Sequence, residues 1–267
     1  QDLKPCLSLG EHVLTSFSVD GDAPLQRAPL TLLRCGFCGL VQLQNSVSPA
    51  ILYGQASSSF YWYRSSMNAT MREHLRSLMA AVALEADLGP RDIVVDIGSN
   101  DGHMLSTLEV PGVIRVGFEP GRLFEAEAMR KGVYVLDSLF RGIDYNATFN
   151  RRAQAITLVS VFYDMEDPLK VLAELEEILD TNGVLLIEMN SLSTMVENTA
   201  YDMIGHEHLC YWPLAALERL LRQVGLQIYR AETIAINGGS LRLWIDRRFR
   251  PVEDSVQAQR FREQTLV

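Results

Sequence analysis

The chain has 267 residues, of which 48% are hydrophobic and 21% are charged, and its formal net charge is −9. This size predicts one large globular domain with an appendage. The acidic balance and the absence of any basic run exclude nucleic acid as an expected partner. No apolar stretch is long enough to span a membrane and no signal-peptide pattern is seen, so we expect a cytoplasmic protein without a membrane partner.

The first segment, residues 1–55, contains short apolar runs and several prolines but no long periodic pattern. We expect a small β-rich module that needs a metal or a neighbouring domain to hold it together. The chain's four cysteines are too few for a disulfide scaffold. Cys35 and Cys38 have the spacing of two thiolates on one zinc ion, which is half a site. A redox pair is disfavoured because no βαβ pattern surrounds them.

Residues 56–90 combine a stretch rich in serine and aromatic residues with a helix expected at about 67–87. Thr70 and Glu73 have the spacing of a capping box, and apolar residues recur behind them at helical intervals. The aromatic residues of the first stretch, Tyr61 to Tyr63, either cover an apolar face or donate a phenolic hydroxyl to a substrate oxygen.

Strand and helix patterns alternate from residue 91 onward. Strands are expected at 92–97, 113–118, 133–136, 155–161 and 184–190, and helices at 102–109, 121–131 and 168–180. Asp167 and Pro168 have the character of a helix N-cap and first turn, and Asn182-Gly183 that of a helix stop. This alternation predicts a mostly parallel sheet with helices on both faces.

A further helix is expected at about 213–225, followed by strands at 227–234 and 241–246. Two strands without a helix between them must pair antiparallel. The predicted fold class is therefore α/β: a Rossmann-like, mostly parallel seven-stranded sheet that ends in an antiparallel hairpin. This domain would span residues 91–248, and residues 249–267 would begin another region.

The most informative pattern runs from Val94 to Gly102 and is followed by Glu119. Gly98 and Gly102 let the backbone turn tightly and let a ligand approach it. Glu119 follows Gly98 by 21 residues, about the spacing at which a carboxylate on the second strand binds the ribose of a nucleoside. The G-x-x-x-G spacing differs from the G-x-G-x-x-G of dinucleotide enzymes. These motifs resemble those of class I S-adenosylmethionine (SAM) methyltransferases.

The carboxyl ends of parallel strands form the crevice in which α/β folds bind ligands. Glu119 would accept hydrogen bonds from the ribose, and Asp137 or Ser138 would reach the adenine unless they form a plain turn. Asp96 would orient the glycine loop. The residues expected to bind SAM are Asp96, Gly98, Ser99, Asn100, Gly102, Glu119, Pro120, Asp137, Ser138 and Ser160.

A second cluster is His206-Glu207-His208, which lies among tyrosine and tryptophan residues. Its spacing excludes a zinc-protease motif, which needs two histidines at i and i+4. A metal site formed by both histidines lacks a third ligand in the sequence. A neutral histidine can also act as a general base near neutral pH. The plain alternative is a pair of exposed histidines in a loop.

Several motifs occur together in a fixed order: Tyr61-x-Tyr63-x-Ser65, Asp96 to Gly102, His206 to Leu209, and Asn237-Gly-Gly-Ser240-Leu-Arg242. With Cys35-x-x-Cys38, they resemble the C-methyltransferases that act on nucleotide-linked 4-keto-deoxysugars. The resemblance covers nearly the whole chain.

This resemblance implies that His208 is the general base with Glu207 beside it, and that Tyr61 or Tyr63 stabilises an enolate oxygen. Substrate contacts are expected from Ser65, Asn68, Asn190, His206, Asn237 and Ser240. Family members bind one zinc ion through two C-x-x-C pairs, and here only Cys35 and Cys38 match. We therefore expect the first pair to precede this chain and the family's C-terminal α/β domain to follow it.

The predicted function is SAM-dependent C-methylation of a small-molecule acceptor, a sugar nucleotide. O-methylation of a small natural product is the alternative within the same class. A nicotinamide-dependent oxidoreductase or epimerase is the alternative in another enzyme class. A domain that only binds partners through its aromatic segment is the non-enzymatic alternative.

Overall fold

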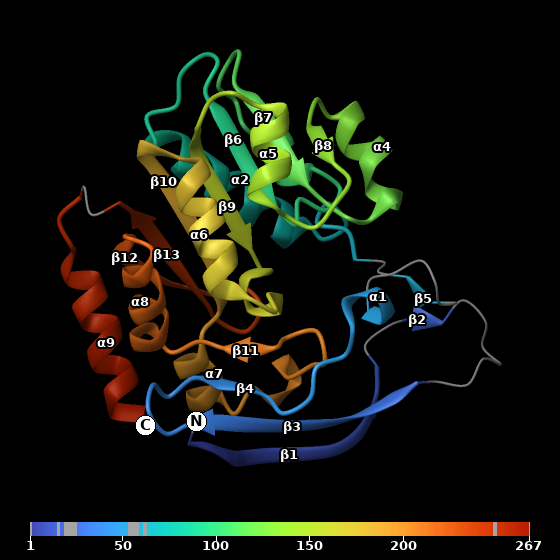
Figure 1. The fold of residues 1–267 in the computed structure, drawn as a ribbon, viewed down its shortest axis with the longest axis vertical. Coiled ribbons are helices and arrows are strands. Elements are labelled where there is room, and N and C mark those ends of the chain that lie inside the picture. Colours follow the sequence, from blue (N-terminus) through green and yellow to red (C-terminus); the bar gives the residue numbers. More distant parts are fainter. Residues whose placement is uncertain are drawn as a thin grey trace.

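The main sheet has seven strands in the order β12-β13-β10-β9-β6-β7-β8. The computed structural model describes residues 2–14, 17–18, 26–52, 59–60, 63–247 and 250–266. The strands are β6 (Ile93–Ile97), β7 (Ile114–Phe118), β8 (Tyr134–Leu136), β9 (Ala153–Val159), β10 (Leu179–Asn190), β12 (Gln227–Ile234) and β13 (Ser240–Asp246). β13 pairs antiparallel with both neighbours, and the other pairings are parallel. The predicted sheet and its terminal hairpin are confirmed (Figure 1).

The central strands read as continuous apolar runs because helices cover both faces of the sheet. Every residue of β6 is buried. Alternate residues of this strand belong to two separate apolar cores, one with α6 and α8 and the other with α2 and α3. The helices on the sheet are α2 (Ala69–Glu85), α3 (His103–Ser106), α4 (Arg122–Arg130), α5 (Gly142–Thr148), α6 (Pro168–Ile178) and α8 (Leu214–Gln223).

Helix α6 starts as predicted but ends earlier. Asp167 caps it through its side chain, and Pro168 occupies the first position. The predicted helix stop at residues 182–183 is wrong, because β10 begins at the residue that caps α6. That strand pairs with β9 at Leu179, passes through a bulge, and resumes pairing at Val184. The two residues therefore lie inside a strand.

The capping box predicted at the start of α2 is also wrong. The N-cap is Asn68, whose Oδ1 accepts hydrogen bonds from the backbone N–H groups of Thr70 (2.8 Å) and Met71 (3.3 Å). Asparagine in an extended conformation is among the strongest N-cap residues. Glu73 instead pairs with Arg76 on the surface of the helix, at 2.6 Å.

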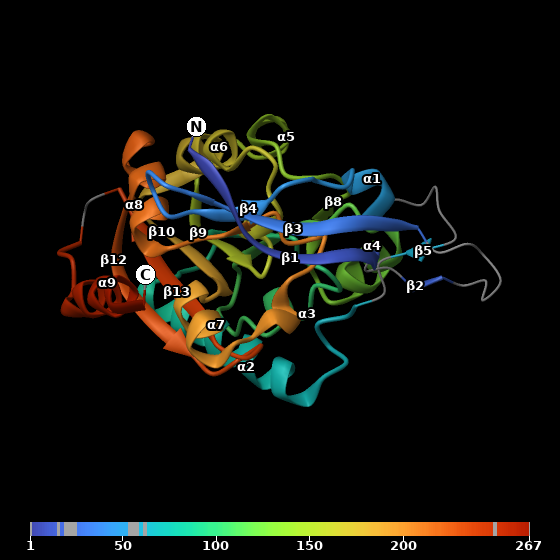
Figure 2. The same ribbon diagram turned by 90° about the horizontal axis from the view of Figure 1, so that it is seen from below.

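A second, antiparallel sheet has the strand order β1-β3-β4-β11. We call it the small sheet. It contains β1 (Leu3–Val13), β3 (Arg27–Cys35), β4 (Val41–Leu43) and β11 (Cys210–Tyr211), while β2 (Phe17–Ser18) and β5 (Ser59–Phe60) form a separate pair. The predicted β-rich N-terminal segment is thus confirmed, but its fourth strand comes from residues just after His208. Figure 1 shows the small sheet below the main sheet, and in Figure 2 it lies in front of it.

The remaining elements are short, except for the last helix. They are α1 (Pro49–Leu52), α7 (Leu192–Asn198), the 3₁₀ turns η1 (Phe162–Asp164) and η2 (Tyr201–Met203), and α9 (Asp254–Leu266). Helix α9 packs against α7, α8 and β12, so it lies against an edge strand of the main sheet. Within the part of the chain that the structure describes, no helix combines the length and apolar character needed to cross a membrane.

Candidate active site

A cavity of about 350 Å³ lies at the carboxyl ends of β6 and β9. It brings together predicted residues from five separate parts of the sequence: Tyr63, Ser65, Asp96, Gly98, Ser99, Ser160, Glu207, His208 and Asn237. Sequence reasoning missed the other lining residues, Met71, Leu75, Met104, Val159, Tyr163, Asp164 and Met203. Tyr163 and Asp164 directly follow the strand end that placed Ser160 at the rim, so the same rule could have identified them.

The glycine loop between β6 and α3 needs glycine for two reasons. Gly98 and Gly102 have φ of +72° and +70°, a region that side chains rarely adopt. A Cβ atom on Gly102 would also lie 2.7 Å from Cβ of Ala128 on α4. Gly98 N–H donates to Phe118 O on β7 at 2.9 Å. The loop is therefore held against two neighbouring elements and its backbone borders the cavity.

Glu119 lies behind this loop rather than among the residues that line the cavity. Its carboxylate accepts hydrogen bonds from the backbone N–H groups of Asn100 (2.9 Å) and Gly121 (2.7 Å). Burial raises the pKa of Glu119, those two donors oppose the shift, and the charge of Asp137 adds to it. A carboxylate has about four acceptor positions, so two remain for ribose hydroxyls.

Asp96 is fully enclosed at the end of β6. Thr157 Oγ1 on β9 donates to its Oδ1 at 2.7 Å. Burial raises the pKa of Asp96 to about 7, the threonine hydroxyl opposes that shift, and the neighbouring Glu119 adds to it. The side chain is thus tied to the next strand, and Asp96 lines the cavity. Its role in orienting the glycine loop stays a prediction.

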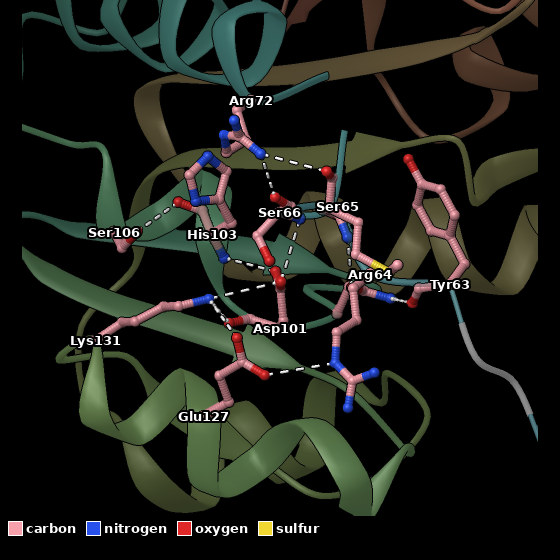
Figure 3. A network of polar contacts seen from close by, with 12 residues as sticks. Tyr63, Arg64, Ser65, Ser66, Arg72, Asp101, His103, Ser106, Glu127 and Lys131 are labelled. Carbon is pink, nitrogen blue, oxygen red and sulfur yellow. Dashed lines mark hydrogen bonds and ion pairs between the residues drawn. The ribbon is translucent and has the colours of Figure 1, made fainter. Parts of the chain in front are cut away.

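Residues 63–68, which we call the strap, are pinned to the glycine loop by side chains of that loop. Asn100 donates through Nδ2 to Tyr63 O at 2.9 Å and accepts through Oδ1 from Ser65 N at 3.0 Å. Asp101 Oδ2 accepts from Ser66 N at 3.2 Å (Figure 3). The amide of Asn100, predicted to contact SAM, is therefore engaged with the strap, and it holds Tyr63 and Ser65 at the cavity.

The strap is also linked to α4 by a chain of charges (Figure 3). Asp101 is completely buried, and its Oδ2 lies 3.6 Å from Lys131 Nζ. Lys131 also lies 3.1 Å from Glu127, which in turn lies 3.6 Å from Arg64 of the strap. A buried carboxylate needs such pairing, because an unpaired charge is costly to remove from water.

His208 borders the cavity in a defined protonation state. Its Nδ1 lies 2.8 Å from Met203 O. A carbonyl oxygen only accepts, so Nδ1 carries the proton and Nε2 has the lone pair. The ring packs against Tyr163 with centroids 4.3 Å apart. Burial lowers the pKa of His208, and the Met203 carbonyl partly offsets this. At neutral pH the imidazole is therefore neutral and able to accept a proton.

His206 does not join His208 in a metal site or line the cavity. Its side chain is 1% exposed, and Nε2 lies 3.1 Å from Ala28 O on β3. This placement argues against the substrate contact predicted for it. Among the residues described, no three histidine, cysteine, aspartate or glutamate side chains are grouped so as to hold a metal ion.

The other predicted substrate residues are dispersed. Asn190 ends β10, and neither atom of its buried amide has a hydrogen-bond partner in the described part of the chain. Ser240 donates to Ile236 O at 3.1 Å, within the hairpin turn that also places Asn237 at the cavity. Asn68 caps α2 and is exposed, which does not favour the substrate role predicted for it.

The remaining predicted residues lie away from the cavity lining. Pro120 and Asp137 are exposed, and Ser138 is half-buried with its backbone N–H bonded to Leu136 O at 2.8 Å. They follow β7 and β8 beside Glu119, so a ligand that reaches past Glu119 would meet them. Tyr61 lies outside the described residues.

Cys35 and Cys38 lie in one turn at the end of β3. Backbone N–H groups of Cys38 and Phe37 lower the pKa of the Cys35 thiol, whereas burial raises that of Cys38. Cys6 is exposed and donates to Leu32 O at 3.4 Å instead of joining them. A structural zinc ion takes four ligands, and the described residues supply two here, so the residues present do not fit a complete zinc site.

The order of the strands and the glycine loop with its acidic neighbour are those of SAM-dependent methyltransferases. Residues 67–231 match the methyltransferase-domain family, and the chain belongs to that family. The C-methyltransferase NovU of Streptomyces niveus is 28% identical over 215 residues, which are 80% of this chain and 50% of NovU. The chain thus spans about half the length of this curated relative.

Solved structures share the fold. Magnesium protoporphyrin IX methyltransferase (ChlM) from Synechocystis PCC 6803 with bound SAH has a TM-score of 0.51 at 13% identity, covering 68% of this chain and 89% of that one. An S-adenosylmethionine-dependent methyltransferase from Clostridium acetobutylicum ATCC 824 has a TM-score of 0.50 at 12% identity, covering 66% and 91%. At such identities the likeness shows the fold alone.

Proposed function

We propose that this methyltransferase transfers a methyl group to carbon in a nucleotide-linked keto-deoxysugar, with His208 as the general base. The observation that carries this proposal is the contact of His208 Nδ1 with Met203 O, which leaves the lone pair on Nε2, in a residue that lines the same cavity as the SAM-type glycine loop. The name of the relative NovU, a C-methyltransferase, supports carbon as the site of transfer.

A carbon next to a ketone becomes nucleophilic once it loses a proton. His208 takes that proton at Nε2, because Nδ1 is committed to Met203 O. The negative charge then moves to the ketone oxygen. Tyr63 lines the same cavity, and burial raises the pKa of its phenol, so the hydroxyl stays protonated and can donate to that oxygen. SAM supplies the electrophilic methyl group when bound.

The residues around the glycine loop would hold SAM. The Gly98 and Ser99 backbone borders the cavity, Glu119 would accept the ribose hydroxyls, and Asp137 or Ser138 would meet the adenine. Ser99 Oγ is buried with no hydrogen-bond partner among the described residues, which suits a polar ligand beside it. Holding the reacting carbon and the methyl group about 3 Å apart is the main contribution of such a site.

Other polar residues would orient the acceptor. Ser65 and Asn237 line it. Asn190 and Ser240 lie side by side as a register pair at the ends of β10 and β13. The unpartnered amide of Asn190 supports a ligand there, because a buried amide without partners costs free energy. We assign these four residues to the hydroxyl groups of a sugar.

Substitution of His208 tests the base assignment. We expect His208→Ala to bind SAM as the native protein does, measured by calorimetry, and to lose methyl transfer to a nucleotide-linked 4-keto-deoxysugar by about 1,000-fold, within the range for loss of a general base. Proton exchange at the carbon next to the ketone, followed by NMR in D₂O without SAM, should fall in parallel.

The matched control is His12→Ala, which removes an exposed histidine from β1. Undiminished transfer by His208→Ala would refute the base assignment. A product that carries the methyl group on oxygen would favour the alternative of O-methylation.

A further inference from the structure

The segment that carries His208 is attached to the small sheet on both sides. We call residues 205–209 the base loop. Before His208, His206 Nε2 lies 3.1 Å from Ala28 O on β3. After it, Leu43 N–H on β4 donates to Leu209 O at 2.9 Å. The chain then continues as β11, which pairs with β4. The segment on both sides of His208 is therefore bonded to β3 and β4, which lie near the start of the sequence.

The ring of His206 is placed to hold a hydrogen bond rather than to fill space. Its Nε2 must carry the proton, because Ala28 O only accepts. Its Nδ1 is buried without a hydrogen-bond partner in the described part of the chain. An apolar side chain would avoid the cost of that buried nitrogen. The hydrogen bond to Ala28 O is thus what an imidazole supplies at this position and an apolar side chain would not.

We propose that His206 is a positioning residue, which sets the place of His208 in the cavity by binding Ala28 O on the small sheet. This proposal rests on the function proposed above for His208. The small sheet then supports the segment that carries the base. Glu207 lies between the two histidines and also lines the cavity. The hydrogen bond from His206 to Ala28 O therefore orients this residue as well.

The surroundings of His208 explain why its position matters. Tyr163 of η1 and Tyr211 of β11 face the ring, with centroids 4.3 and 6.4 Å away. Asp164 and Glu207 line the same cavity. Met203 O accepts from the ring at Nδ1. A base loop released from the small sheet would change the burial of the imidazole and its bond to Met203, and with them the pKa of His208.

Two amide variants separate the hydrogen bond from the mere presence of a side chain. The glutamine amide nitrogen reaches about as far as Nε2 of histidine, whereas that of asparagine reaches only about as far as Nδ1. We therefore expect His206→Gln to retain the bond to Ala28 O and His206→Asn to lose it. The matched control is His12→Gln, on the exposed part of β1.

The first readout is NMR of ¹⁵N-labelled histidine rings across a pH titration, which needs no acceptor. In the native protein and His206→Gln, His208 should show the Nδ1–H tautomer and a pKa below the usual range. In His206→Asn it should show mixed tautomers and a pKa nearer the ordinary histidine value. The second readout is kcat, which should fall about 100-fold in His206→Asn, as for a misplaced catalytic group, with SAM affinity unchanged.

Circular dichroism checks that each variant folds. Native-like His208 signals in a folded His206→Asn would overturn the proposal, and so would equal release of His208 in both amide variants. If His206→Asn does not fold, His206→Gln decides alone: native-like His208 signals support the anchor and altered signals overturn it. Since these signals do not depend on methyl transfer, they remain informative if His208→Ala shows that His208 is not the base.

Discussion

Backbone carbonyls decide which nitrogen carries the proton in both histidines of the base loop. Met203 O binds His208 through Nδ1, and Ala28 O binds His206 through Nε2. The two side chains are two positions apart and have the same chemistry, yet one borders the cavity and the other is buried against β3. The assignment of a general base thus depends on the partner of each ring, which no local motif contains.

Asp96 should make the stability of the protein depend on pH. Burial raises its pKa to about 7, above the roughly 3.9 of an unfolded aspartate. The folded protein therefore holds a proton that the unfolded chain has lost. This contribution to stability is fully present below about pH 4 and is lost as the pH rises through 7, at up to about 1.4 kcal/mol per pH unit.

Asp96→Asn removes the titration but keeps an oxygen that can accept from Thr157 Oγ1. We expect the free energy of unfolding, measured with urea at pH 5, 6, 7 and 8, to fall less steeply in this variant than in the native protein. The control is Asp167→Asn, at the exposed N-cap of α6, which should leave the slope unchanged. Equal slopes for Asp96→Asn and the native protein would contradict the prediction.

At the scale of elements, Asn100 couples the glycine loop to the strap. Asn100→Ala removes both the bond to Tyr63 O and that from Ser65 N. We expect a loss of about 1–3 kcal/mol in the free energy of unfolding, since two partly buried backbone groups lose their partner. Hydrogen exchange of the Ser65 amide should also become faster, because the strap is released from the loop.

Asn68→Ala provides the matched control within the strap. It removes the N-cap of α2, which should cost about 1 kcal/mol. It leaves the two bonds of Asn100 intact, so the exchange of the Ser65 amide should stay close to that of the native protein. Equal exchange in Asn100→Ala and Asn68→Ala would show that Asn100 does not hold the strap.

The sequence was sufficient to predict elements whose burial pattern is continuous. The strand at 93–97 is buried at every position, and the predicted glycine turn follows it. β11 was not predictable, because its two residues form a strand only by pairing with β4. The role of His206 was equally hidden, since its partner Ala28 lies 178 positions away. Local patterns do not encode such long-range contacts.

At the scale of the whole molecule, each of the two sheets positions a different part of the site. The main sheet supplies the glycine loop and Asp96, and the small sheet supports the base loop. An apolar cluster joins the small sheet to α7, with Leu30, Leu32, Leu43 and Tyr211 of the small sheet packed against Met195. The base loop at the cavity is therefore supported by segments that lie far from it in the sequence.

Helix α9 supports this assembly through Glu263, a buried carboxylate at the start of α8. Its Oε2 accepts from Leu214 N at 2.7 Å, and its Oε1 accepts from Gln259 Nε2 at 2.9 Å. The first N–H groups of a helix have no partner within the helix, so Glu263 satisfies one of them. Gln259 also donates to Ser193 Oγ of α7 at 3.2 Å, which links α7, α8 and α9.

Glu263→Ala should lower the free energy of unfolding by about 1–3 kcal/mol, because the buried Leu214 N–H loses its acceptor. Glu263→Gln should lose less, since its amide oxygen can still accept that bond. Urea unfolding measures both variants, and hydrogen exchange at Leu214 reports the local effect. Equal stability of the two variants would show that packing of α9, rather than this hydrogen bond, holds the start of α8 in place.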